Sequence, residues 1–336
     1  MTRPRNQQVV LEATPYYHCI SRCVRRAFLC GQDRHTGQSF EHRKVWVVER
    51  LAALADVFAV DVCAYAVMSN HYHLVLRVNT AQAEAWSDQE VAEQWMKLFS
   101  GSLLVQRWLA RTLDDIASEQ RALEIIALWR KRLCDLSWFM RCLNEHLARR
   151  ANEEDGCTGR FWEGRFKTQA LLDEAAVLAC MAYVDLNPIR AGIADLPEES
   201  AHTSIQQRIR ELAAGSSRSA GKTDDTKKPQ LLPMLDAGNA DSDNPDTVLG
   251  YRLMDYLELI DWTGRATRQG KRGAIDRAAP KILQRLGIDT AMWLRHMRPR
   301  RNRMLAALGA VAQLRQYIEA TGRKWLVDQK SAVLTR

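Results

Sequence analysis

The sequence NHYHLVL over Asn70–Leu76 decides how this chain is interpreted. In a β-strand successive side chains point to opposite faces, so His71 and His73 share one face. The alternate residues from Tyr72 to Val78 share the other face, are apolar, and are expected to pack against helices. Two imidazoles on one face can bind a divalent metal, or they can form a polar outer face of a sheet. A metal site therefore needs a third ligand from elsewhere in the chain.

The residues around this stretch predict an α+β fold. Before it, the pattern predicts a strand, a helix and a second strand that pairs with residues 71–78 as a hairpin. After it, helices are predicted over about 88–152, followed by a strand and a helix. The predicted elements are Tyr16–Ser21, Val45–Phe58, Val60–Met68, His71–Val78, Trp162–Leu172 and Asp173–Asn187. This order is typical of a ferredoxin-like (RRM-like) antiparallel sheet with a helical insertion over about 80–150.

Local composition divides the chain into three parts. Residues 1–196 contain the predicted sheet. Residues 213–246 are rich in Gly, Ser, Pro and charged side chains, which bury little surface, so they predict a flexible linker. Residues 247–336 are again apolar at helical spacing and predict a mostly helical C-terminal extension, for which clustered arginines indicate DNA binding.

The overall composition excludes several classes of protein. The chain has 336 residues, is 46% hydrophobic and carries a formal net charge of +8, so it is neither a disordered chain nor a small disulfide scaffold. Its cysteines form no CxxC pair, so a zinc ribbon is not expected. It has no apolar run long enough to cross a membrane and no signal peptide, so we expect a cytoplasmic protein without a membrane partner. Clumped basic residues favour a polyanionic partner.

A second group of polar residues lies on the predicted helix Asp173–Asn187. Tyr183 follows a stripe of small alanines, which leaves space around its phenol, and Asn187 lies one turn further on. Tyrosine can act as a covalent nucleophile, and a metal assists attack on a phosphodiester. The alternative is a tyrosine that packs at the helix end and an asparagine that caps the helix before Pro188.

Two motifs taken together resemble a known family. Asn70–Leu76 resembles the histidine–hydrophobe–histidine (HUH) signature, and Tyr183–Gly192 (YVDLNPIRAG) resembles the tyrosine helix of the REP-associated tyrosine transposases. Tyr17–Arg22 and Gly159–Phe166 also match the pattern of that family, so the resemblance covers about residues 14–196. These proteins are single-tyrosine HUH nucleases related to insertion-sequence transposases.

The resemblance implies a site and a mechanism. It implies that His71 and His73 hold Mg²⁺ or Mn²⁺, with Asn187 as the third ligand. It implies that Tyr183 attacks single-stranded DNA and forms a 5′-phosphotyrosine link with a free 3′-hydroxyl, before a strand is transferred. The implied substrate is single-stranded or hairpin DNA from palindromic repeats, and the chain would act as a monomer or homodimer. The helical insertion and the C-terminal extension are departures from a minimal domain of this family.

Basic and aromatic residues supply candidate DNA contacts. Arginine and lysine pair with phosphates, and an indole can stack on an unpaired base. The alternative is that the charges lie on a solvated surface and the aromatic rings belong to the core. The candidates are Arg22, Arg160, Trp162, Arg165, Lys167, Arg190, Arg298, Arg300 and Arg301.

Two other functions compete with the transposase. A ferredoxin-like module that binds nucleic acid without catalysis would need neither a metal nor Tyr183. A two-histidine metalloenzyme acting on a small molecule would need a further His or carboxylate at a recognisable spacing, and it would leave the basic clusters without a role.

Overall fold

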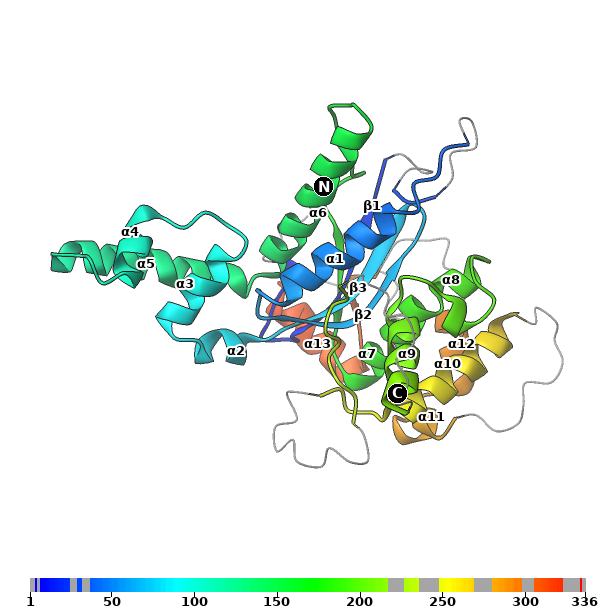
Figure 1. Cartoon of the computed structure of the whole chain (residues 1–336). Coiled ribbons are helices and arrows are strands. Elements are labelled where there is room, and N and C mark those ends of the chain that lie inside the picture. Colours follow the sequence, from blue (N-terminus) through cyan, green and yellow to red (C-terminus); the bar gives the residue numbers. More distant parts are fainter. Residues whose placement is uncertain are drawn as a thin grey trace.

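The chain folds around one mixed sheet with helices on both of its faces (Figure 1). The computed structural model describes residues 4, 7–24, 29–31, 37–216, 227–235, 248–268, 280–297, 305–322 and 333. In these ranges the strand order of the sheet is β2-β3-β1-β4-β5. The sheet and the many helices confirm an α+β protein.

The strands of the sheet are mostly antiparallel. They are β1 (Tyr16–Arg22), β2 (Val60–Val67), β3 (His71–Val78), β4 (Lys167–Leu171) and β5 (Ala307–Leu308). β1 pairs antiparallel with β3 and β4, β2 pairs antiparallel with β3, and β5 pairs parallel with β4. The strand predicted over Trp162–Leu172 is shorter than expected, because Trp162 makes only an isolated bridge with Cys23 before the chain enters β4.

Helices α1 (Arg43–Ala55) and α6 (Leu136–Glu154) pack against each other and cover one face of the sheet. This is the face of the apolar side chains of β3, as the alternation of that strand predicts. Tyr72 is fully buried there, and its hydroxyl donates to Oδ1 of Asn144 on α6 at 2.6 Å. The ring of Phe58 meets that of Phe139 edge-on, with the centroids 5.4 Å apart.

Helix α7 (Glu174–Asp185) covers the opposite face, the face of His71 and His73. Its N-terminus is capped by Asp173, and its alanines are buried, which allows the helix to lie close to the sheet. The helix predicted over Asp173–Asn187 ends at Asp185. Asn187 instead begins the short helix α8 (Asn187–Arg190), since a proline at 188 is compatible with a first helical turn but not with a helix interior.

Helices α2 (Thr80–Ala85), α3 (Asp88–Met96), α4 (Leu103–Leu109) and α5 (Ile116–Leu133) lie where the sequence predicts a helical insertion. They project away from the sheet in Figure 1. Trp95 and Trp129 stack there with ring centroids 5.1 Å apart, and Phe99 stacks on Trp95 at 4.3 Å. Trp138 of α6 meets both Trp95 and Phe99, so this aromatic cluster joins the insertion to the rest of the core.

The segment predicted as a linker over 213–246 is partly structured. Helix α9 (Ser204–Ser216) extends into it, and α9 packs against β2. Further on, Leu231 and Leu232 are buried, and the Leu232 amide donates to the Val62 carbonyl at 2.8 Å. The segment is polar on average, so its composition does not reveal these few apolar residues. They hold residues 227–235 against β2, at the edge of the sheet. The rest of the predicted linker lies outside the described residues.

The C-terminal part packs onto the same body. It contains α10 (Leu253–Arg268), α11 (Lys281–Arg285), α12 (Thr290–Met297), β5 and α13 (Val311–Ala320). Asp185 at the end of α7 is fully buried and joins three segments, because it accepts from Ser204 Oγ at 2.5 Å, Ile205 N at 3.0 Å and Tyr256 Oη at 2.5 Å.

Within the described ranges, every helix is too short or too polar to cross a lipid bilayer.

Candidate active site

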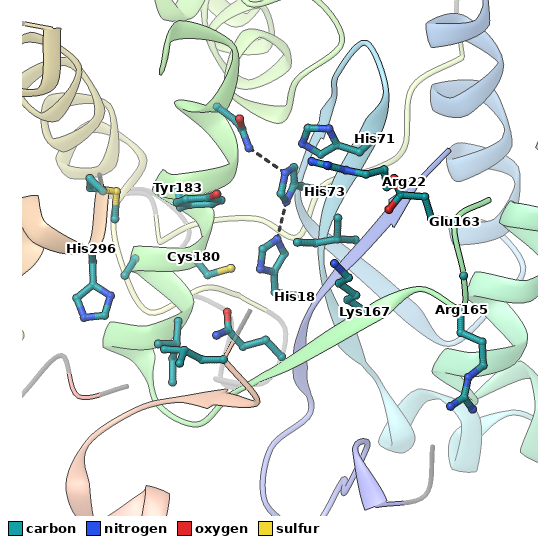
Figure 2. Close-up of a pocket in the computed structure, with 18 residues that line it drawn as sticks. His18, Arg22, His71, His73, Glu163, Arg165, Lys167, Cys180, Tyr183 and His296 are labelled. Carbon is teal, nitrogen blue, oxygen red and sulfur yellow. Dashed lines mark hydrogen bonds between the residues drawn. The ribbon is translucent and has the colours of Figure 1, made fainter. Parts of the chain in front are cut away.

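A pocket of about 400 Å³ opens between the histidine face of the sheet, α7 and the C-terminal segments. Figure 2 shows Tyr183 between His296 on one side and His71 on the other. The lining residues come from all strands of the sheet except β2, and from the helices and loops around them. They are His18, Ile20, Arg22, His71, His73, Glu163, Gly164, Arg165, Lys167, Gln169, Ala179, Cys180, Tyr183, Asn187, His296, Met297, Leu305 and Leu308.

The two histidines of β3 lie together in this pocket. Their ring centroids are 4.8 Å apart, as expected for residues two positions apart on one strand face. Nδ1 of His71 lies 2.6 Å from Oδ1 of Asn70, in the turn before the strand. His73 is 3% exposed, whereas His71 is half-buried at the mouth of the pocket.

A third imidazole, that of His18 on β1, also lies in this pocket. The sequence motif Tyr17–Arg22 contains it, but strand pairing alone brings it beside the other two. Ile20 pairs with His73 and Arg22 with His71, so His18 lies diagonally next to His73 on the same face. Nε2 of His18 is 2.9 Å from Nδ1 of His73 (Figure 2).

Tyr183 reaches the imidazoles from α7. Its ring centroid lies 5.8 Å from that of His73 and 6.2 Å from that of His18, in edge-on geometry. The guanidinium of Arg190 lies over the phenol ring, 4.3 Å from its centroid. Tyr183 thus lies beside His73, one of the two predicted ligands, within one chain.

Asn187 contacts the same histidine, although it lies on α8 rather than on the helix of Tyr183. Its Nδ2 is 2.9 Å from Nε2 of His73. Rotation of the amide by half a turn would bring Oδ1 to this position, where it could face a cation together with the imidazole. Leu186, between α7 and α8, keeps helical backbone angles. Asn187 therefore still lies about one turn beyond Tyr183, as the sequence predicts.

Burial keeps the imidazoles neutral. It lowers the pKa of His18 to about 4, and with the positive charges of Arg22 and Lys167 it lowers the pKa of His71 to about 4. Burial and the neighbouring His18 hold the pKa of His73 well below 6.5. At neutral pH each ring therefore keeps one unprotonated nitrogen that can accept a hydrogen bond or bind a cation.

Some of the predicted DNA contacts lie at the pocket and others do not. Arg22, Arg165 and Lys167 line it, and Arg190 lies behind it on the ring of Tyr183. Glu163, which the sequence did not indicate, also lines the pocket, close to Arg22 in Figure 2. Arg298, Arg300 and Arg301 lie outside the described residues.

Trp162 and Arg160 are turned toward the protein instead. Trp162 packs edge-on against Tyr72 on the far face of the sheet, and its Nε1 donates to the Asn144 carbonyl at 2.8 Å. Arg160 donates to the carbonyl oxygens of Trp162 and Glu163 at 2.9 and 2.5 Å. These contacts hold the loop that precedes β4, and they leave the ring of Trp162 half-buried.

A divalent cation fits this donor set with help from a substrate. In the part of the chain that the structure describes, no three His, Cys, Asp or Glu side chains form a group that could hold a metal ion. His71, His73 and the amide oxygen of Asn187 would be the protein ligands, and substrate oxygens would complete the shell. Imidazole nitrogen makes this set more suitable for Mn²⁺ than for Mg²⁺, which prefers oxygen ligands.

The C-terminal segments supply one wall of the pocket, which the sequence did not predict. Met297, Leu305 and Leu308 line it with His296, next to Cys180 of α7. This wall exists because α12 packs against α7 and because β5 adds to β4 as the edge strand of the sheet. A two-residue strand has no pattern of its own from which this pairing could be recognised.

Comparisons with known proteins add a distant similarity. No protein-family model and no curated protein matches this chain. Among solved structures, the chain is similar to a REP-associated tyrosine transposase bound to a REP hairpin, with 12% sequence identity and a TM-score of 0.32. The similarity covers 69% of this chain and 99% of that chain. At this level it does not assign the chain to a family.

Proposed function

We propose that this chain is a metal-dependent single-stranded DNA endonuclease and strand transferase of the HUH type, which acts on hairpin-forming DNA with Tyr183 as nucleophile. The observation that carries the proposal is the position of the Tyr183 phenol. It lies beside His73, with the ring centroids 5.8 Å apart, in a pocket lined by basic residues. A nucleophile, candidate cation ligands and positive charge thus meet at one place, as attack on a phosphodiester requires.

Each residue has a defined role in the proposed reaction. His71, His73 and Asn187 would hold Mn²⁺ or Mg²⁺, which when bound polarises a phosphate oxygen. The hydroxyl oxygen of Tyr183 forms a bond to phosphorus while the bond to the 3′-oxygen breaks. The phenol loses its proton and the leaving oxygen gains one, so the products are a 5′-phosphotyrosine and a 3′-hydroxyl. Attack by a 3′-hydroxyl in the reverse direction joins a strand and restores the phenol.

The basic residues hold the phosphate and the phenol. Arg22 and Lys167 place positive charge at the pocket, where it offsets the charge of the DNA backbone, whereas the guanidinium of Arg165 is directed away from the imidazoles in Figure 2. Arg190 restrains the ring of Tyr183 by lying over it, which is favourable for a cation on an aromatic face. Arg190 also forms a side-chain hydrogen bond with Tyr183, which ties the guanidinium to the phenol.

The topology supports an HUH domain. The unit β1-α1-β2-β3-α6-β4 has the strand order β2-β3-β1-β4, with α1 and α6 on one face, which agrees with a ferredoxin-like arrangement. The opposite face is then left to the histidines and to α7. Because Tyr183 and the histidines belong to the same chain, a monomer would suffice for cleavage.

The test is formation of a covalent protein–DNA adduct. The purified chain is incubated with Mn²⁺ and a pool of hairpin oligonucleotides that carry randomised single-stranded flanks, so that no target sequence needs to be known. Adducts are separated under denaturing conditions. The proposal expects the label to stay with the protein when the DNA is labelled at its 3′ end, and to be released when the DNA is labelled at its 5′ end.

Tyr183→Phe is the decisive variant, and Tyr16→Phe is its matched control, because Tyr16 undergoes the same chemical change without lining the pocket. The adduct should disappear in the first variant and persist in the second. If DNA binds equally well without metal and never becomes attached to the protein, the chain is a non-catalytic binding module and not an enzyme.

A further inference from the structure

His18 lies at the centre of the site, and the proposed reaction leaves it without a role. It is 4% exposed, and its ring lies within 21° of the plane of the His73 ring, with the centroids 5.1 Å apart. Its Nε2 faces Nδ1 of His73 at 2.9 Å, so its nitrogen is directed at another imidazole rather than at the pocket. This geometry differs from that of a third metal ligand.

We infer that His18 is a positioning residue, which fixes the tautomer and the ring orientation of His73 so that His73 presents an unprotonated Nε2 to the cation. The inference rests on the proposed function. A neutral imidazole carries its proton on one nitrogen only, and only the other nitrogen can bind a metal. Nε2 of His73 is the nitrogen that faces Asn187, the other candidate ligand. Nδ1 must then carry the proton and donate it to a hydrogen-bond acceptor, and Nε2 of His18 is that acceptor.

Strand β4, which pairs with β1, carries the last residue of this series of hydrogen bonds. Gln169 on β4 pairs directly with His18 across the sheet and is its hydrogen-bond partner. If His18 accepts through Nε2, its own proton is on Nδ1, and the amide oxygen of Gln169 can accept it. His73 then donates to His18 and His18 donates to Gln169, which leaves Nε2 of His73 unprotonated for the cation.

His71 shows the same arrangement with a different partner. Its Nδ1 lies 2.6 Å from Oδ1 of Asn70, and an amide oxygen can only accept. His71 therefore donates from Nδ1 and also keeps Nε2 unprotonated. Metal-binding histidines are commonly oriented by such a partner on the second ring nitrogen. Asn70 does this for His71, and His18 does it for His73.

The experiment compares variants of His18 by their affinity for Mn²⁺, measured from the electron paramagnetic resonance signal of the free ion and without DNA. His18→Phe keeps an aromatic ring at this position but removes the acceptor. His18→Gln keeps an amide that can accept. His146→Phe, on α6 and outside the pocket, is the matched control. We expect the affinity to fall by about 10- to 100-fold in His18→Phe, to be partly retained in His18→Gln and to be unchanged in the control.

A second measurement does not depend on any variant. Nitrogen-15 spectra of the imidazoles in the metal-free wild-type protein report which nitrogen of His73 carries the proton. The inference requires protonated Nδ1, and a predominant Nε2–H form of His73 would overturn it even if His18→Phe failed to fold.

The outcomes separate the inference from the proposed function. If the wild-type chain binds Mn²⁺ neither alone nor with hairpin DNA present, the proposed function fails. If the wild type binds Mn²⁺ and folded His18→Phe binds it as tightly, the positioning role of His18 is wrong while the proposed function stands.

Discussion

Asp185→Asn should remove a pH dependence of stability that this carboxyl imposes on the fold. Asp185 is fully buried, and burial raises the pKa of its carboxyl from the ordinary 3.8 to about 6. A carboxyl with a higher pKa in the folded than in the unfolded chain stabilises the fold below about pH 4, and this contribution is lost as the pH rises through about 6. The change in pKa corresponds to about 3 kcal/mol.

The asparagine variant should keep the local structure. The Oδ1 atom that accepts from Ser204 and from the Ile205 amide has a counterpart in asparagine, and the Tyr256 hydroxyl can turn to accept from the new amide. The charge is lost while the packing is retained. The free energy of unfolding of the variant, relative to the wild type, should therefore rise by up to about 3 kcal/mol between about pH 4 and about pH 7.5.

Urea unfolding followed by circular dichroism at several pH values measures this difference. Other titrating groups cancel, because both proteins share them. Asp114→Asn, at a carboxyl that is 92% exposed, serves as the control and should show almost no change with pH. A difference between Asp185→Asn and the wild type that stays constant with pH would refute the reasoning.

Two further predictions concern the site and the insertion. Arg190→Gln should slow adduct formation by about 100-fold, because it removes the guanidinium that holds the Tyr183 phenol in place; Arg190→Lys should recover only part of the rate, and equal single-turnover rates in all three proteins would contradict the role of Arg190. Trp129→Ala should lower the free energy of unfolding by about 3–5 kcal/mol, since it removes a buried, stacked indole from the insertion, yet leave Mn²⁺ affinity intact. Loss of Mn²⁺ binding by the folded variant would show that the insertion and the pocket are not independent.

Much of the sheet could be predicted from local patterns. The alternation in β3 assigned His71 and His73 to one face and the apolar residues to the other, and the structure has both faces as predicted. The small residues of α7 indicated open space around Tyr183. These features depend on residues close together in sequence, for which the periods of strand and helix are sufficient.

The remaining parts of the site depend on contacts between distant residues. His18 reaches His73 only through the pairing of β1 with β3, and His296 reaches the pocket only through the C-terminal segments. Trp162 shows the converse difficulty. An aromatic residue between arginines gives the same pattern whether it faces DNA or the core, and here it packs against Tyr72.

The wall formed by His296, Met297, Leu305 and Leu308 has a consequence for how the protein is made. A translating ribosome delivers the histidines and Tyr183 well before the strand that completes the sheet edge. A fragment that stops before residue 296 would carry the histidines and Tyr183, but its pocket would lack one wall. If the chain cuts DNA as proposed, that activity is tied to the finished polypeptide, and nascent or truncated copies are poor nucleases.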